Sequence, residues 1–160
     1  VRRDQLRKMA PLSMMASFFV AHVFHWGDVH LQNLGERGKQ ISPLASAMQA
    51  GVCFTLHQDS PVLPPNIWES IWCAATRITR SGQKLEPRER IPVYDALKAA
   101  TINGACQYFE EGEKGSLRPG KRADMIVVDW NPLEHSIDDL QRVQVLETIK
   151  DGKTVYQKGK

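Results

Sequence analysis

Residues 54–62, with the sequence FTLHQDSPV, decide the fold class of this chain. They continue an apolar run that starts at Val52 and ends abruptly after Leu56, and the prolines nearby prevent a helix from continuing through the segment. A buried strand that carries an acid just beyond its carboxyl end is the way in which α/β barrels present catalytic groups. The stretch therefore predicts that Asp59 points into a cleft above a sheet, where its carboxylate could hold a metal ion or take up a proton.

Strands and helices are predicted to alternate around this stretch. The continuous apolarity of residues 14–23 is typical of a strand that is covered on both faces. Ser42 is placed as the N-cap of a helix over residues 43–50. After the second strand, Asn66 can cap another helix, whose apolar side chains recur at helical spacing until Gly82 stops it. This order of elements predicts a parallel α/β fold.

The last part of the chain has a different pattern. Residues 115–121, GSLRPGK, form a turn-rich connector, and residues 123–129 read as a strand. Alternating apolar residues then lead to Asp151-Gly152, a pair that favours a type I′ turn between antiparallel strands. We therefore predict an α/β part over residues 1–114 and a small β part over residues 115–160.

Composition and charge are those of one ordinary globular domain. The 160 residues carry 21 basic and 18 acidic side chains, a net charge of +3, and the signs are interspersed, so neither nucleic-acid binding nor membrane attraction is indicated. The three cysteines are odd in number and lack CxxC spacing, which favours a reducing, cytoplasmic location. No apolar stretch approaches the roughly 20 residues of a membrane span.

Four motifs carry a resemblance to a known family: SFFVAH at 17–22, FHWGD at 24–28, HQDSPV at 57–62 and GSLRPGKRAD at 115–124. Together they resemble the carboxyl-terminal third of metal-dependent amidohydrolases, in the branch of N-substituted formamide deformylase-like enzymes. The resemblance implies that residues 1–114 are the last strand–helix units of a TIM-type (β/α)8 barrel. It also implies that residues 115–160 are part of a small β-sandwich, the composite domain.

The resemblance also implies a chemistry for Asp59. Enzymes of this superfamily hydrolyse amide and related C–N bonds with one or two divalent metals, commonly zinc. Asp59 corresponds to the aspartate that follows the eighth barrel strand, which ligates metal and shuttles a proton from the attacking water to the leaving nitrogen. A metal lowers the pKa of bound water from about 15.7 to roughly 7, so that a nearby carboxylate can take up and deliver that proton. The expected substrate is a small-molecule, non-peptide amide.

The other metal ligands of the family have no counterpart in this sequence. The His-x-His pair of the first strand, the mid-barrel lysine or acidic ligand, and the histidines of strands five and six would precede Val1. Because a zinc site needs at least three protein ligands, we expect Asp59 alone not to hold metal tightly and the isolated chain to be inactive. The rival expectation is a non-catalytic, truncated chain that self-associates as a homo-oligomer or pairs with the missing part of the barrel, because an opened barrel leaves unpaired strand edges.

Three side chains besides Asp59 are predicted to line the substrate cleft. His22 stands at the end of the first predicted strand, and Trp26 stands in the loop that follows it. His57 precedes Asp59 by two residues, so both side chains share one side of an extended chain. A purely structural role for His57, and a capping role for Asp59 in the irregular segment before Pro61, remain the alternatives.

Two further groups of residues leave alternatives open. An independent zinc site of His22, His25 and His30 is not favoured, because His22 and His25 would face opposite sides of a strand. Arg77 lies in the helix after the second strand, where a solvated face is the default interpretation and anchorage of the helix to a neighbour is the alternative. Packing in the core is favoured for Trp72.

Overall fold

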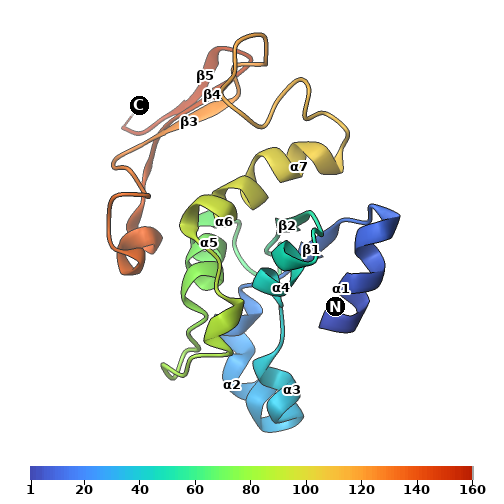
Figure 1. Ribbon diagram of the computed structural model, residues 1–160. Coiled ribbons are helices and arrows are strands. Elements are labelled where there is room, and N and C mark those ends of the chain that lie inside the picture. Colours follow the sequence, from blue (N-terminus) through green and yellow to red (C-terminus); the bar gives the residue numbers. More distant parts are fainter. Residues whose placement is uncertain (160) are drawn as a thin grey trace.

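The computed structural model describes residues 1–159 and contains two short strands that lie side by side within a body of helices (Figure 1). β1 (Ala16–Phe18) and β2 (Phe54–Leu56) pair in parallel, with Phe18 opposite Leu56. Parallel strands need a long crossover connection, and here helices occupy most of the segment between them. The predicted α/β class with a parallel strand pair is therefore confirmed.

The first strand is much shorter than the apolar run over residues 14–23 predicts. β1 ends at Phe18, and α2 (His22–Leu34) begins four residues later. Val20 and Val23 are fully buried, one in the turn and the other in the first turn of α2. The run is apolar because it is buried, and continuous apolarity does not distinguish a buried strand from the buried start of a helix.

The helices predicted before and after the second strand are present with shifted ends, among further helices. Together these are α1 (Arg3–Met9), η1 (Ala10–Leu12), α3 (Glu36–Lys39), α4 (Leu44–Gln49), α5 (Ile67–Thr76), η2 (Pro87–Glu89), α6 (Val93–Ala100) and α7 (Ile102–Gln107). The predicted Ser42 cap is wrong, because Pro43 precedes the first turn of α4 and Ser42 has a φ of 48°. α5 follows Asn66 as predicted but ends well before Gly82, because Arg77 adopts a left-handed backbone conformation. Within residues 1–159, no helix combines the length and apolarity that crossing a lipid bilayer requires.

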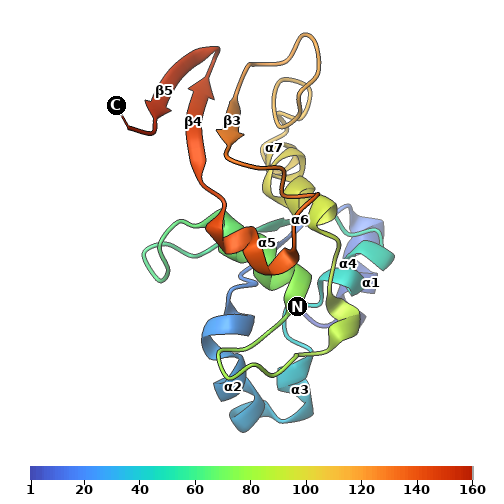
Figure 2. The same ribbon diagram turned by 90° about the vertical axis from the view of Figure 1, so that its left-hand side faces the viewer.

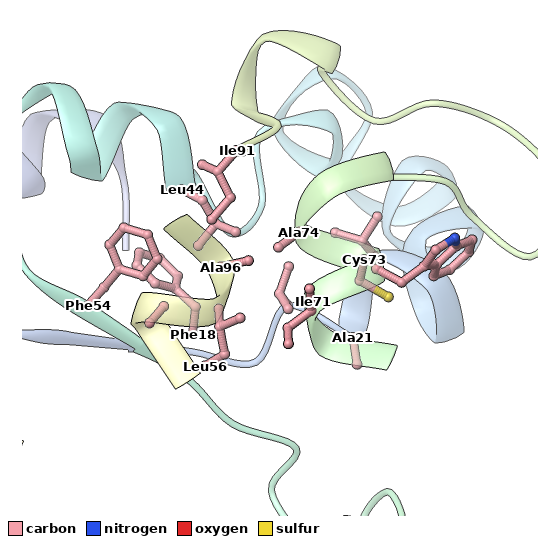
Figure 3. Close-up of a cluster of buried hydrophobic side chains, with 14 of the residues drawn as sticks. Phe18, Ala21, Leu44, Phe54, Leu56, Ile71, Cys73, Ala74, Ile91 and Ala96 are labelled. Atoms are coloured by element: carbon pink, nitrogen blue, oxygen red, sulfur yellow. The ribbon is translucent and has the colours of Figure 1, made fainter. Parts of the chain in front are cut away.

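The hydrophobic core lies between the strand pair and helix α5 (Figure 3). The rings of Phe18 and Phe54 meet edge to face at 5.6 Å between centroids, a geometry that adds to the stabilisation from burial. Trp72 is buried and packs against Phe24 at 5.3 Å, so the predicted packing role is confirmed. Around these rings lie the buried apolar residues Leu44, Leu56, Ile71, Cys73, Ala74, Ile91 and Ala96.

Arg77, which directly follows α5, is completely buried. Its guanidinium donates hydrogen bonds to the carbonyl oxygens of Leu85 at 2.7 Å, Ser42 at 2.8 Å and Ile41 at 2.6 Å. Burial lowers the pKa of Arg77 to about 10, so the group still carries its charge at neutral pH. The predicted solvated face is therefore wrong, and the alternative is confirmed: Arg77 anchors the end of α5 to the segment that precedes α4.

A second buried charge, Glu89 in η2, joins three elements. Its carboxylate accepts hydrogen bonds from the backbone N–H and the hydroxyl of Ser46 in α4, at 2.9 and 2.5 Å. Arg3 in α1 donates to the same carboxylate at 2.8 Å from Nε and lies 2.7 Å away through its terminal nitrogen. Burial alone would raise the pKa of Glu89, but the Ser46 hydrogen bonds and Arg3 outweigh it, so this pKa lies below its ordinary value of 4.5.

We predict that Glu89→Gln destabilises the chain by about 2 kcal/mol at neutral pH, since charge-assisted hydrogen bonds are lost in a buried place. The lowered pKa means that the ionised form stabilises the fold above pH 4.5 and that this contribution disappears as the pH falls through the folded-state pKa. Urea unfolding from pH 7 to pH 3 should therefore show the variant and the wild type converging in acid. A difference that stays constant over this range would contradict the assignment.

The carboxyl-terminal strands form a separate antiparallel sheet in the order β3 (Met125–Val128), β4 (Val145–Lys150), β5 (Lys153–Gln157) (Figure 2). The predicted hairpin is confirmed: Asp151 and Gly152 join β4 to β5 and both have positive φ, 48° and 73°, as a type I′ turn requires. Before β4, η3 (Ile137–Arg142) packs against α5 and contributes the fully buried Leu140 to the core. The boundary between residues 114 and 115 stays a prediction.

Candidate functional site

The candidate site lies where β1 and β2 end. Since the strands are parallel, their carboxyl ends meet at the same edge, and the segments that follow them come together there. The backbone N–H of His57 donates to the carbonyl oxygen of Phe18 at 3.1 Å, which continues the pairing one step beyond the strands. Phe19 follows β1 at this edge, and His57 and Asp59 follow β2.

An aromatic cluster forms around Phe19. Its ring centroid lies 4.4 Å from that of His22, 5.4 Å from that of His57 and 5.9 Å from that of Trp26. The structure therefore brings together the three side chains that the sequence placed in a cleft. Two of the predicted positions are wrong in their local structure, because His22 begins α2 and Trp26 lies one turn further along it, whereas a strand end and a loop were expected.

His22 also contacts His30, two turns further along α2. Nδ1 of His22 lies 3.0 Å from Nε2 of His30, and the two rings are stacked with centroids 5.2 Å apart. Burial lowers the pKa of His22, the charges of His30 and His57 lower it further, and Asp59 opposes them. The neutral imidazole is thereby favoured, and in that form one ring nitrogen donates while the other accepts.

His25 lies at the margin of the cluster around Phe19, where its ring centroid is 5.5 Å from that of Trp26. Its Nε2 lies 3.1 Å from a carboxylate oxygen of Glu69, the third residue of α5, and Arg80 lies 3.3 Å from its Nδ1. Glu69 therefore contacts the neighbouring helix α2, and Asn66, predicted to cap α5, precedes the helix without a side-chain capping hydrogen bond. The pair joins α2 to α5 close to the start of each helix.

Asp59 is exposed and has a left-handed backbone with a φ of 54°. Its carbonyl oxygen accepts a hydrogen bond from the backbone N–H of Val62 at 2.9 Å, and the hydroxyl of Ser60 closes the same turn on Leu63. Among residues 1–159, no hydrogen bond or ion pair reaches the Asp59 carboxylate. The backbone of Asp59, and not its carboxylate, closes this turn, so the described chain leaves the carboxylate free for a ligand.

Among the described residues, Asp59 could serve as one ligand of a metal site. A free carboxylate at a strand end is a suitable ligand for a divalent cation. In the part of the chain that the structure describes, however, no three His, Cys, Asp or Glu side chains converge as a metal group would require. Asp59 is therefore a candidate for one ligand of a set that needs further members.

Two residues of the site, Phe19 and His30, were not assigned to it from the sequence. Phe19 was hidden in the apolar run that was interpreted as strand. His30 could have been found from spacing, because His22, Trp26 and His30 are four residues apart and share one face of a helix.

This chain is similar in sequence and in structure to known metal-dependent hydrolases and related enzymes. The amidohydrolase family matches residues 1–156. N-substituted formamide deformylase of Arthrobacter pascens is 33% identical over 156 residues, which cover 96% of this chain and 29% of that enzyme. An uncharacterized metal-dependent hydrolase from Pyrococcus horikoshii superposes with a TM-score of 0.73 at 24% identity, over 86% of this chain and 29% of that one.

A more distant structure is an adenosine deaminase from Xanthomonas campestris with bound zinc, with a TM-score of 0.53 at 22% identity over 71% of this chain and 28% of that one. The chain therefore spans about 29% of the length of the formamide deformylase. Because the family match extends over residues 1–156, this chain belongs to the amidohydrolase family.

Proposed function

We propose that this chain is the carboxyl-terminal part of the catalytic unit of a metal-dependent hydrolase that cleaves the C–N bond of a small, non-peptide amide. In this proposal Asp59 is both a metal ligand and the proton shuttle. The observation that carries it is the free Asp59 carboxylate at the carboxyl end of β2, next to the aromatic cluster around Phe19. The formamide deformylase of A. pascens, 33% identical, supports the amide as the substrate class.

The same proposal assigns the two parts of the chain. β1 and β2 are the seventh and eighth strands of a (β/α)8 barrel, and residues 1–114 supply its last strand–helix units. Residues 115–160, with the sheet of β3, β4 and β5, belong to the composite β-sandwich domain. The parallel pairing of β1 with β2 and the position of Asp59 beyond the carboxyl end of β2 support this assignment.

Each side chain of the site has a defined task in this chemistry. A divalent metal, for which zinc is our choice, supplies Lewis-acid activation of the attacking water when bound. The Asp59 carboxylate has no other hydrogen-bond partner within the described chain, so one of its oxygens can take up a proton and deliver it to the leaving nitrogen. Trp26 and His22 form an apolar and partly buried wall that holds the amide substituent and limits the access of water. His57 connects this wall to Asp59.

Metal content tests the proposal most directly. After dialysis against zinc and then buffer, we expect the isolated 160-residue chain to retain far less than one zinc per chain, because Asp59 lacks the further ligands that a zinc site needs. The product of the complete reading frame should retain near-stoichiometric zinc, and less of it with Asp59→Asn. Stoichiometric zinc in the isolated chain that is unaffected by Asp59→Asn would contradict the assignment of Asp59.

A second candidate function is non-catalytic association with another copy of the chain or with the rest of a barrel. It is favoured by the apolar side chains that the carboxyl-terminal sheet exposes, among them Ile126 at 47%, Val155 at 62% and Tyr156 at 49%. Exposed apolar strands of this kind favour pairing. A start and a stop codon that enclose these 160 residues in the source DNA would favour this candidate, and an open frame that encodes His-x-His after an earlier strand would favour the hydrolase.

A further inference from the structure

A recess rich in arginine lies between α1, α4 and η2, and neither Asp59 nor the Phe19 cluster borders it. Its volume is about 430 Å³. Three of the side chains that line it are arginines, and they come from two separate elements. Those that matter for its chemistry are Arg3, Arg7, Ser46, Gln49, Arg88 and Glu89.

The walls of this arginine recess are held in place by one buried carboxylate. Glu89 is 1% exposed, and it ties Arg3 of α1 and Ser46 of α4 to η2 through the hydrogen bonds described above. These buried, charge-assisted hydrogen bonds fix α1, α4 and η2 relative to one another, and with them the backbone positions from which Arg7 and Arg88 project. The walls of the recess are therefore in place before a ligand arrives, and only the exposed side chains of Arg7 and Arg88 need to be ordered on binding.

Two guanidiniums of the recess have no acidic partner among the described residues. Arg7 follows Arg3 by four residues, so both project from the same face of α1, and Arg88 immediately precedes Glu89. Neither Arg7 nor Arg88 forms an ion pair with any residue from 1 to 159. The three arginines face Glu89 in the recess and Glu86, whose carboxylate lies 3.8 Å from Arg3, so an excess of one positive charge remains. Gln49 adds a neutral amide at the same wall.

We propose that the arginine recess binds a small dianionic oxyanion, namely a phosphate monoester. The planar fork of arginine matches the oxygens of phosphate and donates two parallel hydrogen bonds to them. The volume exceeds that of the phosphate group alone, which leaves room for the alcohol part of the ester. This inference is independent of the proposed hydrolase activity, because it uses no residue of that site.

Calorimetric titration of the 160-residue chain with glycerol phosphate tests the inference, with inorganic phosphate and succinate as separate arms at constant ionic strength. We expect Arg7→Ala and Arg88→Ala each to weaken phosphate-ester binding by roughly tenfold and the double variant to abolish it, because each removes charge-assisted hydrogen bonds. Binding should also weaken in 0.5 M sodium chloride, since these arginines are exposed and therefore screened.

The control variant is Arg142→Ala, which removes the same charge from η3, where the side chain is 80% exposed and pairs with Asp139. Arg7 and Arg88 are chosen because the buried network does not include them, so thermal unfolding without ligand should be unchanged in both variants. Binding of inorganic phosphate with the same variant pattern would support an oxyanion site that does not need the ester. Equal loss with Arg142→Ala, stronger binding of succinate, or no binding of either phosphate would overturn the inference.

Discussion

Replacing Arg77 by methionine is expected to destabilise the chain by about 3–5 kcal/mol, since it removes a buried guanidinium that donates hydrogen bonds to several backbone carbonyl oxygens. Three carbonyl oxygens, of Leu85, Ser42 and Ile41, would lose the Arg77 donor; the bond to Leu85 is buried, and those to Ser42 and Ile41 are partly buried. A buried acceptor left without a partner costs about 1–3 kcal/mol, and the segment before α4 would lose its connection to the end of α5. Methionine fills part of the volume of the Arg77 side chain. The expected loss of stability therefore comes mainly from the carbonyl oxygens that lose a hydrogen-bond donor.

Urea unfolding followed by circular dichroism measures this loss, with two companion variants. Arg77→Lys keeps the charge but cannot reach three carbonyls with a planar fork, so an intermediate loss of about 1–3 kcal/mol is expected. Arg142→Ala, at an arginine that is largely exposed, should change the free energy of unfolding by less than about 0.5 kcal/mol. If Arg77→Met lowered the free energy of unfolding as little as Arg142→Ala, the role of Arg77 as a buried anchor would be contradicted. Should Arg77→Met fail to fold, Arg77→Lys still tests the anchor.

Replacing Asp59 by asparagine is expected to lower kcat for amide hydrolysis by about 10²–10⁴-fold in the product of the complete reading frame, measured with formamide-type substrates and zinc. The expectation rests on the proposed function. Asparagine has nearly the same shape as aspartate but cannot take up the proton that the leaving nitrogen requires. Asp59 lies in an exposed turn that its backbone closes, so the variant should fold normally.

The Asp59 experiment needs a control for metal loss and one for charge. Activity of the variant is measured with increasing zinc, because a weakened metal site recovers with excess zinc whereas a missing proton shuttle does not. Asp4→Asn removes a carboxylate from the surface of α1, where it pairs with Arg2, and should leave kcat unchanged. Retention of full activity by Asp59→Asn would exclude this residue as the proton shuttle.

Some elements could be predicted from the local sequence because the residues next to one another in the chain specify their backbone conformation. Strand β2 was identified from an apolar run that ends in polar residues and proline. The hairpin at Asp151-Gly152 was identified because only a few residue types tolerate the positive φ angles of its turn. The first strand was overestimated because burial makes residues 14–23 apolar whatever their backbone conformation. Because residues 14–23 were interpreted as a strand, the helical spacing of His22, Trp26 and His30, which indicates the approach of His22 to His30, was not recognised.

By itself, the sequence determined the α/β class, the carboxyl-terminal hairpin and, through its motifs, the family. It also placed Asp59 beyond the end of a strand, because the change from apolar to polar residues after Leu56 is visible in the local sequence. Only the tertiary structure decided where the charged side chains go. Arg77 is buried and Arg7 is exposed, although their side chains are identical. The fold brings the carbonyls of Leu85, Ser42 and Ile41 to Arg77, whereas within residues 1–159 it brings no acid to Arg7.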